Sequence, residues 1–118
     1  MPGESRIQVV LLTVEYSTRS SYYLDWVDAF ASSLHFTVSC YNLLNRHQRS
    51  AARRAVEAAE LVVALHACSA DTLDFIKPLA TALQSRRGRF LMFVANEYNL
   101  PWAPLSEKRA FVREVNAE

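Results

Sequence analysis

Polar clusters that follow apolar runs hold the side chains of this chain that are best suited to chemistry. Residues 96–99, Asn-Glu-Tyr-Asn, come directly after the apolar run 90–95. A buried parallel strand delivers polar side chains in this way to the edge of an α/β sheet, where such folds bind ligands. Three more polar clusters follow other apolar segments, at 15–19, 41–47 and 66–71. Together the four clusters predict one site at the edge of a sheet.

A carboxylate and an imidazole in two of these clusters are suited to proton transfer. Glu15 follows the first apolar run, and His66 lies near the end of the third. If the two strands are neighbours, Glu15 can orient the imidazole of His66 and raise its basicity, as general base catalysis requires. We therefore expect His66 to be the catalytic base. The alternative is that His66 ends its strand and bonds to a neighbouring loop.

The cluster after the last apolar run is suited to binding a polyol or a sugar. Asn96 and Glu97 supply the paired donors and acceptors that hydroxyl groups need. Tyr16, Tyr98 and Trp102 offer flat rings that can stack on a sugar face. The alternatives are that Asn96 and Glu97 hold the following turn through backbone N–H groups, and that the rings are partly buried loop aromatics.

Composition excludes several other kinds of site. The only glycines are Gly3 and Gly88, so a Gly-rich phosphate loop of either common type is not possible. The three histidines fall in separate segments without ligand spacing, which predicts no metal site. The net charge of +1 indicates no nucleic-acid partner. We expect the arginines at 46, 49 and 53 to lie on a solvated helix face.

The cysteines and the first apolar run indicate in which cellular compartment the protein is expected. Cys40 and Cys68 lack redox or metal spacing, and we expect both to be buried free thiols. The run Ile7–Leu12 is too short for a signal peptide or a membrane span. These features predict a soluble, cytoplasmic protein without a membrane span.

The elements that must position the clusters alternate between strand and helix patterns. Four β-rich segments predict strands at 7–13, 36–41, 61–67 and 90–95. Helical spacing predicts helices between them, with core positions of the first at Tyr23, Trp26, Val27, Phe30 and Leu34. The others are expected at 51–60, 70–86 and 105–115. Pro78 should break the third near its middle, and Gly88 is suited to the C′ position after it.

This β-α alternation predicts the fold. Right-handed crossovers between successive strands give a parallel sheet with helices on both faces. We expect a three-layer α/β/α Rossmann-like domain with a four-stranded parallel sheet in the order 2-1-3-4, or alternatively 3-2-1-4. With 118 residues the chain forms one domain.

A receiver domain shares this architecture but needs different side chains. Its chemistry requires a phosphorylatable aspartate at the end of strand 3 and an acidic pair after strand 1. Here strand 3 ends in His66-Ala67-Cys68, and strand 1 is followed by the single Glu15. The sequence therefore argues against an active receiver.

Three segments resemble a known family of enzymes. The strand and loop at 93–100, Phe-Val-Ala-Asn-Glu-Tyr-Asn-Leu, the following Ser-Glu-Lys-Arg-Ala-Phe-Val at 106–112 and the earlier segment 61–71 are similar to bacterial glycosyltransferase-like proteins. The likeness is to the N-terminal domain of the two-domain, GT-B-type members, and it covers most of the chain from Ile7 to Ala117.

The resemblance implies a division of labour between two domains. In such enzymes the N-terminal domain holds the sugar or glycan acceptor, and a C-terminal domain binds the nucleotide-sugar donor. Residues 1–118 would then be the N-terminal part of a longer protein, inactive alone and without a cofactor of its own. Glu15, Tyr16, Asn96, Glu97 and Tyr98 would line the cleft, with His66 as the first candidate for the base.

Two other interpretations stay open. The chain could be a non-catalytic α/β interaction module or a degenerate receiver-like module that dimerises through Tyr22, Trp26 or Trp102. It could also be a small hydrolase or nucleotide-processing enzyme of flavodoxin-like shape, although the absence of a Gly-rich loop counts against that class.

Overall fold

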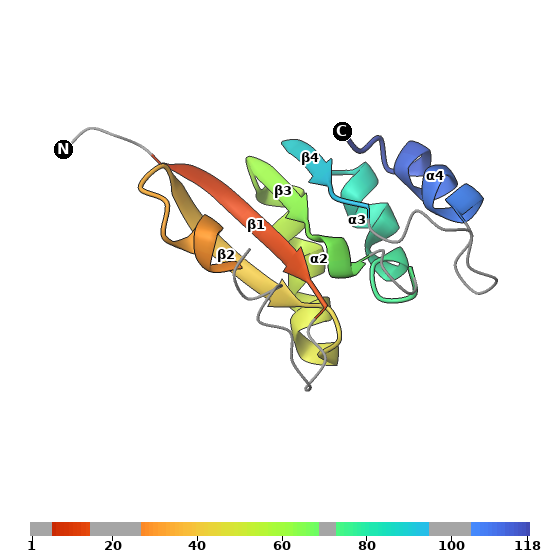
Figure 1. The fold of residues 1–118 in the computed structure, drawn as a ribbon, viewed down its shortest axis with the longest axis horizontal. Helices are drawn as coiled ribbons and strands as arrows, with labels where there is room; N and C mark the ends of the chain where they lie inside the picture. Colours follow the sequence, from red (N-terminus) through yellow and green to blue (C-terminus); the bar gives the residue numbers. More distant parts are fainter. Residues whose placement is uncertain (1–5, 15–26, 69–72, 95–104) are drawn as a thin grey trace.

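A four-stranded parallel sheet forms the centre of the computed structural model, which describes residues 6–14, 27–68, 73–94 and 105–118. The strands are β1 (Ile7–Thr13), β2 (Phe36–Asn42), β3 (Leu61–Ala64) and β4 (Arg89–Met92), and Figure 1 shows their arrows pointing the same way. Their order is β2-β1-β3-β4 with every pairing parallel. The predicted fold class and the order 2-1-3-4 are therefore confirmed, and the alternative 3-2-1-4 is wrong.

The central position of β1 explains its continuous apolar sequence. It pairs with β2 along its whole length and with β3 from Val9 to Leu12. Side chains on both of its faces are buried, because helices cover both sides of a parallel sheet. The edge strand β2 alternates instead between half-buried and exposed residues over most of its length.

The helices form two layers of unequal size. Side chains of α2 (Arg46–Ala58), α3 (Ala80–Gln84) and α4 (Leu105–Glu114) share one core with Val10, Leu12 and Phe90. Helical residues 27–31 lie on the other face, where Val27 and Phe30 contact the cluster of Val9, Leu11, Val63 and Leu65. Leu34, expected on the core face of that helix, lies beyond its end and is 77% exposed.

Helix α2 begins five residues earlier than the apolar pattern predicts. The Asn45 side chain accepts a hydrogen bond from the Gln48 N–H at 3.0 Å, which makes Asn45 the N-cap. The Gln48 side chain in turn accepts from the Asn42 N–H at 2.8 Å. The polar residues just before position 51 are therefore the cap and first turns of this helix.

The segment around Pro78 is broken, as expected from the missing N–H of proline. A 3-10 turn (Lys77–Leu79) precedes α3, and Pro78 occupies a first-turn position of that 3-10 turn. The strand before this segment is also shorter than predicted. It ends at Ala64, and His66–Cys68 forms a separate 3-10 turn.

Gly88 does not have the role that its place after a helix indicates. Helix α3 ends at Gln84 with Ser85 as its C-cap, so Gly88 lies beyond the C′ position. A Cβ atom at position 88 would lie 2.2 Å from the backbone oxygen of Glu60 and 2.4 Å from that of Ala59. Glycine is required because two backbone segments approach each other closely where β3 and β4 begin.

Candidate functional site

The carboxyl ends of the strands meet at one edge of the sheet, as the predicted site requires. The register pairs Thr13 with Asn42, Leu12 with Ala64, and Ala64 with Met92. His66 follows β3 by two residues and lies at this edge. In parallel α/β sheets this edge is where ligands bind.

Most of the predicted site residues lie outside the described part of the chain. These are Glu15, Tyr16, Asn96, Glu97 and Tyr98. The expected approach of Glu15 to His66 therefore stays a prediction, and so does the sugar-binding role of the cluster at 96–98. His66 can be placed.

The imidazole of His66 is half-buried and stacks on an aromatic ring. Its centroid lies 5.1 Å from that of Phe93, with an angle of 26° between the ring planes. Burial disfavours the charged imidazolium and lowers the pKa of His66 below its usual value of 6.5. The ring is therefore mainly neutral at pH 7, the state in which an imidazole nitrogen can accept a proton.

A buried hydroxyl lies at the same edge and was missed in the sequence. Thr13 ends β1 and is fully buried, and its backbone oxygen accepts from the Leu43 N–H at 2.8 Å. Its side-chain oxygen has no hydrogen-bond partner among the described residues. The available signal was a polar residue at the end of an otherwise largely apolar strand.

The two cysteines differ in their surroundings. Cys68 is fully buried, and its thiol donates to the backbone oxygen of Leu12 at 3.4 Å. Burial raises the pKa of the Cys68 thiol far above its usual value, so it stays protonated and does not act as a nucleophile. Neither cysteine forms a disulfide, as predicted, but the expected burial of Cys40 is wrong, because Cys40 is exposed on the edge strand β2.

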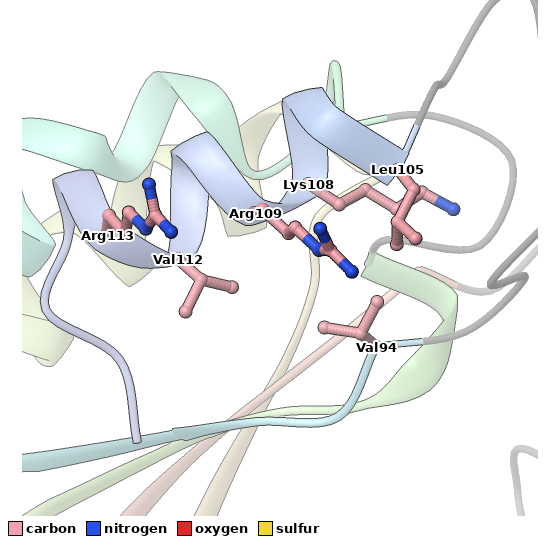
Figure 2. A pocket seen from close by; sticks show the side chains of 6 residues that line it. All are labelled: Val94, Leu105, Lys108, Arg109, Val112 and Arg113. Atoms are coloured by element: carbon pink, nitrogen blue, oxygen red, sulfur yellow. The ribbon is translucent and has the colours of Figure 1, made fainter. Parts of the chain in front are cut away.

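A groove lies between helix α4 and the end of β4. It has a volume of about 560 Å³ and is lined by Val94, Leu105, Lys108, Arg109, Val112 and Arg113. In Figure 2 the side chains of Val112 and Arg109 extend from the helix toward the level of Val94. Lys108 is only 1% exposed, so its aliphatic stem belongs to the packed side of the helix.

The sequence did contain a signal for this groove. Leu105, Lys108, Val112 and Val115 recur at three- and four-residue spacing, which places a lysine within the apolar stripe of the helix. On α2, Arg46 and Arg53 are exposed, which confirms the solvated helix face expected for them. The same expectation is wrong for Arg49, because its side chain is half-buried and its guanidinium donates to the Leu43 oxygen at 2.9 Å.

Two kinds of site receive no support from the described ranges. Within them, no three histidine, cysteine, aspartate or glutamate residues gather closely enough to hold a metal ion. Nor does any helix in these ranges have the length and apolarity needed to cross a bilayer.

Comparisons of the chain with protein-family models, curated proteins and solved structures find no match.

Proposed function

We propose that this chain is the acceptor-side, N-terminal domain of a nucleotide-sugar-dependent glycosyltransferase and that it does not transfer sugar alone. The observation that carries the proposal is the neutral imidazole of His66 at the carboxyl edge of a parallel sheet. Transfer to a hydroxyl group needs a base that is neutral near pH 7, at the place where the fold binds ligands. The resemblance of the segments at 61–71, 93–100 and 106–112 supplies the enzyme class.

The proposed chemistry assigns one proton transfer to this domain. As the acceptor oxygen bonds to the anomeric carbon of the donor sugar, His66 takes the hydroxyl proton. The bond from that carbon to the nucleoside diphosphate breaks, and the diphosphate leaves with the bonding electrons. The stacked ring of Phe93 fixes the plane of the imidazole. A C-terminal donor-binding domain would hold the nucleotide sugar, so this domain needs no cofactor.

The remaining roles fall to residues at the same edge. Asn96 and Glu97 would bind acceptor hydroxyls, Tyr16 and Tyr98 would stack on the sugar face, and Glu15 would orient His66. Stacking rings and paired amide and carboxylate groups supply the shape and hydrogen bonding that a sugar presents.

A nuclear magnetic resonance titration of the 118-residue chain tests the proposal. A panel of mono- and disaccharides should shift the amide and ring signals of His66 and Phe93 and leave those of α2 unchanged. Incubation of the same chain with uridine and guanosine diphosphate sugars should give no transfer. Shifts confined to the groove beside α4 would contradict the proposed acceptor site, as would the absence of any shift at tens of millimolar sugar.

A second candidate is the non-catalytic α/β interaction module. It is favoured by the apolar surface on the sheet face opposite α2 to α4, where Leu91 of β4 is 40% exposed. In that case the stacking of His66 on Phe93 is structural. Light scattering at rising concentration distinguishes the two functions, because an interaction module of this kind would self-associate and ignore every sugar.

A further inference from the structure

Two backbone hydrogen bonds join Glu118 to the outer edge of β4. The Glu118 N–H donates to the Phe90 oxygen at 2.8 Å, and the Met92 N–H donates to the Glu118 oxygen at 3.2 Å. In a parallel ladder a residue bonds in this way to the residues just before and just after its partner. Glu118 is therefore bridged to Leu91 in parallel register, and Figure 1 shows the C-terminus lying beside β4.

The turn after α4 directs the backbone toward the outer edge of β4. Asn116 has φ 54°, the left-handed conformation found after many helices. The Asn116 N–H donates to the Arg113 oxygen at 3.2 Å, and the Ala117 N–H donates to the Val112 oxygen at 3.0 Å. These are the two bonds of a Schellman motif, which ends the helix and fixes the direction in which the chain leaves it.

An arginine holds this turn against the sheet. The guanidinium of Arg86 donates to the oxygens of Val115 at 2.6 Å and Asn116 at 2.8 Å. It also lies 5.5 Å from the centroid of the Phe90 ring, on β4 itself. The direction of the chain at Glu118 is thus set by packed contacts.

The edge of β4 continues beyond the part that Glu118 occupies. The Phe93 N–H donates inward to the Ala64 oxygen at 3.0 Å. Because outward groups alternate with inward ones along a strand, the Met92 oxygen and the Val94 N–H face away from β3. They are the next two positions of the ladder that Glu118 begins.

Apolar side chains are present on both sides of this edge. The groove on the α4 side is lined by Val94, Leu105 and Val112 together with Lys108, Arg109 and Arg113, and Leu91 is 40% exposed on the other side. Side chains of a strand point alternately to the two faces. The first residue after Glu118 would point toward α4, and the second would lie on the face of Leu91.

We infer that the outer edge of β4 is built to receive a fifth parallel strand, and that an extended segment joined to Glu118 would fill it, with apolar side chains toward the α4 groove. The register of two hydrogen bonds, rather than the position of Glu118 in the sequence, carries this assignment. The occupied groove is then an internal packing site between α4 and the added strand, and Arg109 and Arg113 lie along its rim.

Hydrogen exchange in the 118-residue chain tests whether the backbone of Glu118 pairs with β4. Glu118→Pro removes the N–H that donates to Phe90, whereas Glu118→Gln keeps it. The proline variant should speed exchange of the Met92 amide at least ten-fold. The glutamine variant also loses the ion pair of Glu118 with Arg89 but keeps the N–H, so it should speed this exchange far less. Equal exchange of the Met92 amide in the proline variant and the unmodified chain would overturn the inference.

A C-terminal extension of the chain tests whether the outer edge of β4 accepts a longer strand. Six residues of alternating valine and threonine, valine first, are joined to Glu118. The Val94 amide should then exchange at least ten-fold more slowly than in the 118-residue chain, because the second added residue accepts its hydrogen. An unchanged Val94 amide would overturn the inference.

Proline placement within the extension provides the matched control. The second added residue would donate to the Met92 oxygen, and the N–H of the third would point away from β4. Proline at the second position should therefore abolish the protection of Val94, and proline at the third should retain most of it. The reverse pattern would contradict the parallel register. None of these measurements involves sugar, so their failure is distinguishable from failure of the proposed function.

Discussion

Gly88, where β3 and β4 begin, leaves no room for a side chain. Gly88→Ala would place a methyl group 2.2 Å from the backbone oxygen of Glu60 and 2.4 Å from that of Ala59. Both are backbone atoms, so neither can rotate away as a side chain could. Overpacking of this kind costs about 1–3 kcal/mol, so we expect the free energy of unfolding, measured in urea, to fall by that amount. Arg87→Ala, next in the chain and exposed, is the control and should change stability by less than about 0.5 kcal/mol. An unchanged free energy of unfolding for Gly88→Ala would contradict the close approach.

His66 should make stability depend on pH in one direction. Its pKa is lowered in the folded protein by burial, so the unfolded chain binds the proton more readily. Above the unfolded value of 6.5 the residue is neutral in both states and costs nothing. As the pH falls through 6.5, the unfolded state gains the proton first and stability is lost, until the folded value is passed.

Unfolding in urea at pH 7.5 and pH 5.5 measures this loss. We expect His66→Gln to reduce the fall in stability between the two pH values, and His47→Gln, an exposed control, to leave it as it is. A His66→Gln chain that loses as much stability as the unmodified one would show that His66 is not desolvated.

At the scale of elements, Arg86 joins the ends of two helices to the sheet. Its guanidinium donates to Leu83 at the end of α3, at 2.7 Å, and to the two residues after α4. Arg86→Met keeps the stem but removes these charge-assisted bonds, and we expect a loss of about 2 kcal/mol in calorimetric or urea unfolding. Arg86→Lys should recover only part of it, since an ammonium group lacks the planar fork. Full recovery by lysine would contradict the geometry described here.

The start of α2 depends on a single side chain. Asn45→Ala removes the acceptor for the Gln48 N–H and should cost about 1 kcal/mol, with a loss of helical circular dichroism if the first turn frays. Asn45→Asp restores an acceptor and serves as the control. If alanine and aspartate behave alike, the cap contributes nothing.

The bounds of an element could be predicted where they depended on the side chains of that segment alone, and not where they depended on residues distant in the sequence or on backbone hydrogen bonds. The bounds of β1 followed from a seven-residue run with five apolar side chains, and residues 9–12 of that run are buried on both faces of the sheet. The start of α2 was missed because Asn45 and Gln48 are polar and stabilise the helix through backbone bonds, which hydrophobic periodicity does not register. Gly88 was assigned to a helix end because its true neighbours, Ala59 and Glu60, are distant in sequence.

At the scale of the whole molecule, the strand order was predictable and the site only in part. Right-handed crossovers leave few topologies for four β-α units, and the observed order was the first of the two considered. The edge of the sheet followed from that order, and His66 lies there. The groove beside α4 could not be predicted from the strand order. It depends on how α4 packs against the edge strand β4, whose outer side is only partly occupied.

The two thiols should report separately on the surface and on opening of the whole fold. Cys40 is exposed, whereas Cys68 is fully buried beneath the end of β1 with the pKa of its thiol raised. A disulfide reagent at pH 8 should label Cys40 quickly and Cys68 only when the core opens, because the reactive thiolate of Cys68 does not form in the folded state. Cys40→Ser should abolish the fast phase, and mild urea should speed the slow phase in proportion to the population of open molecules. Two fast phases in the native protein would show that the core around Leu12 and Cys68 is not closed.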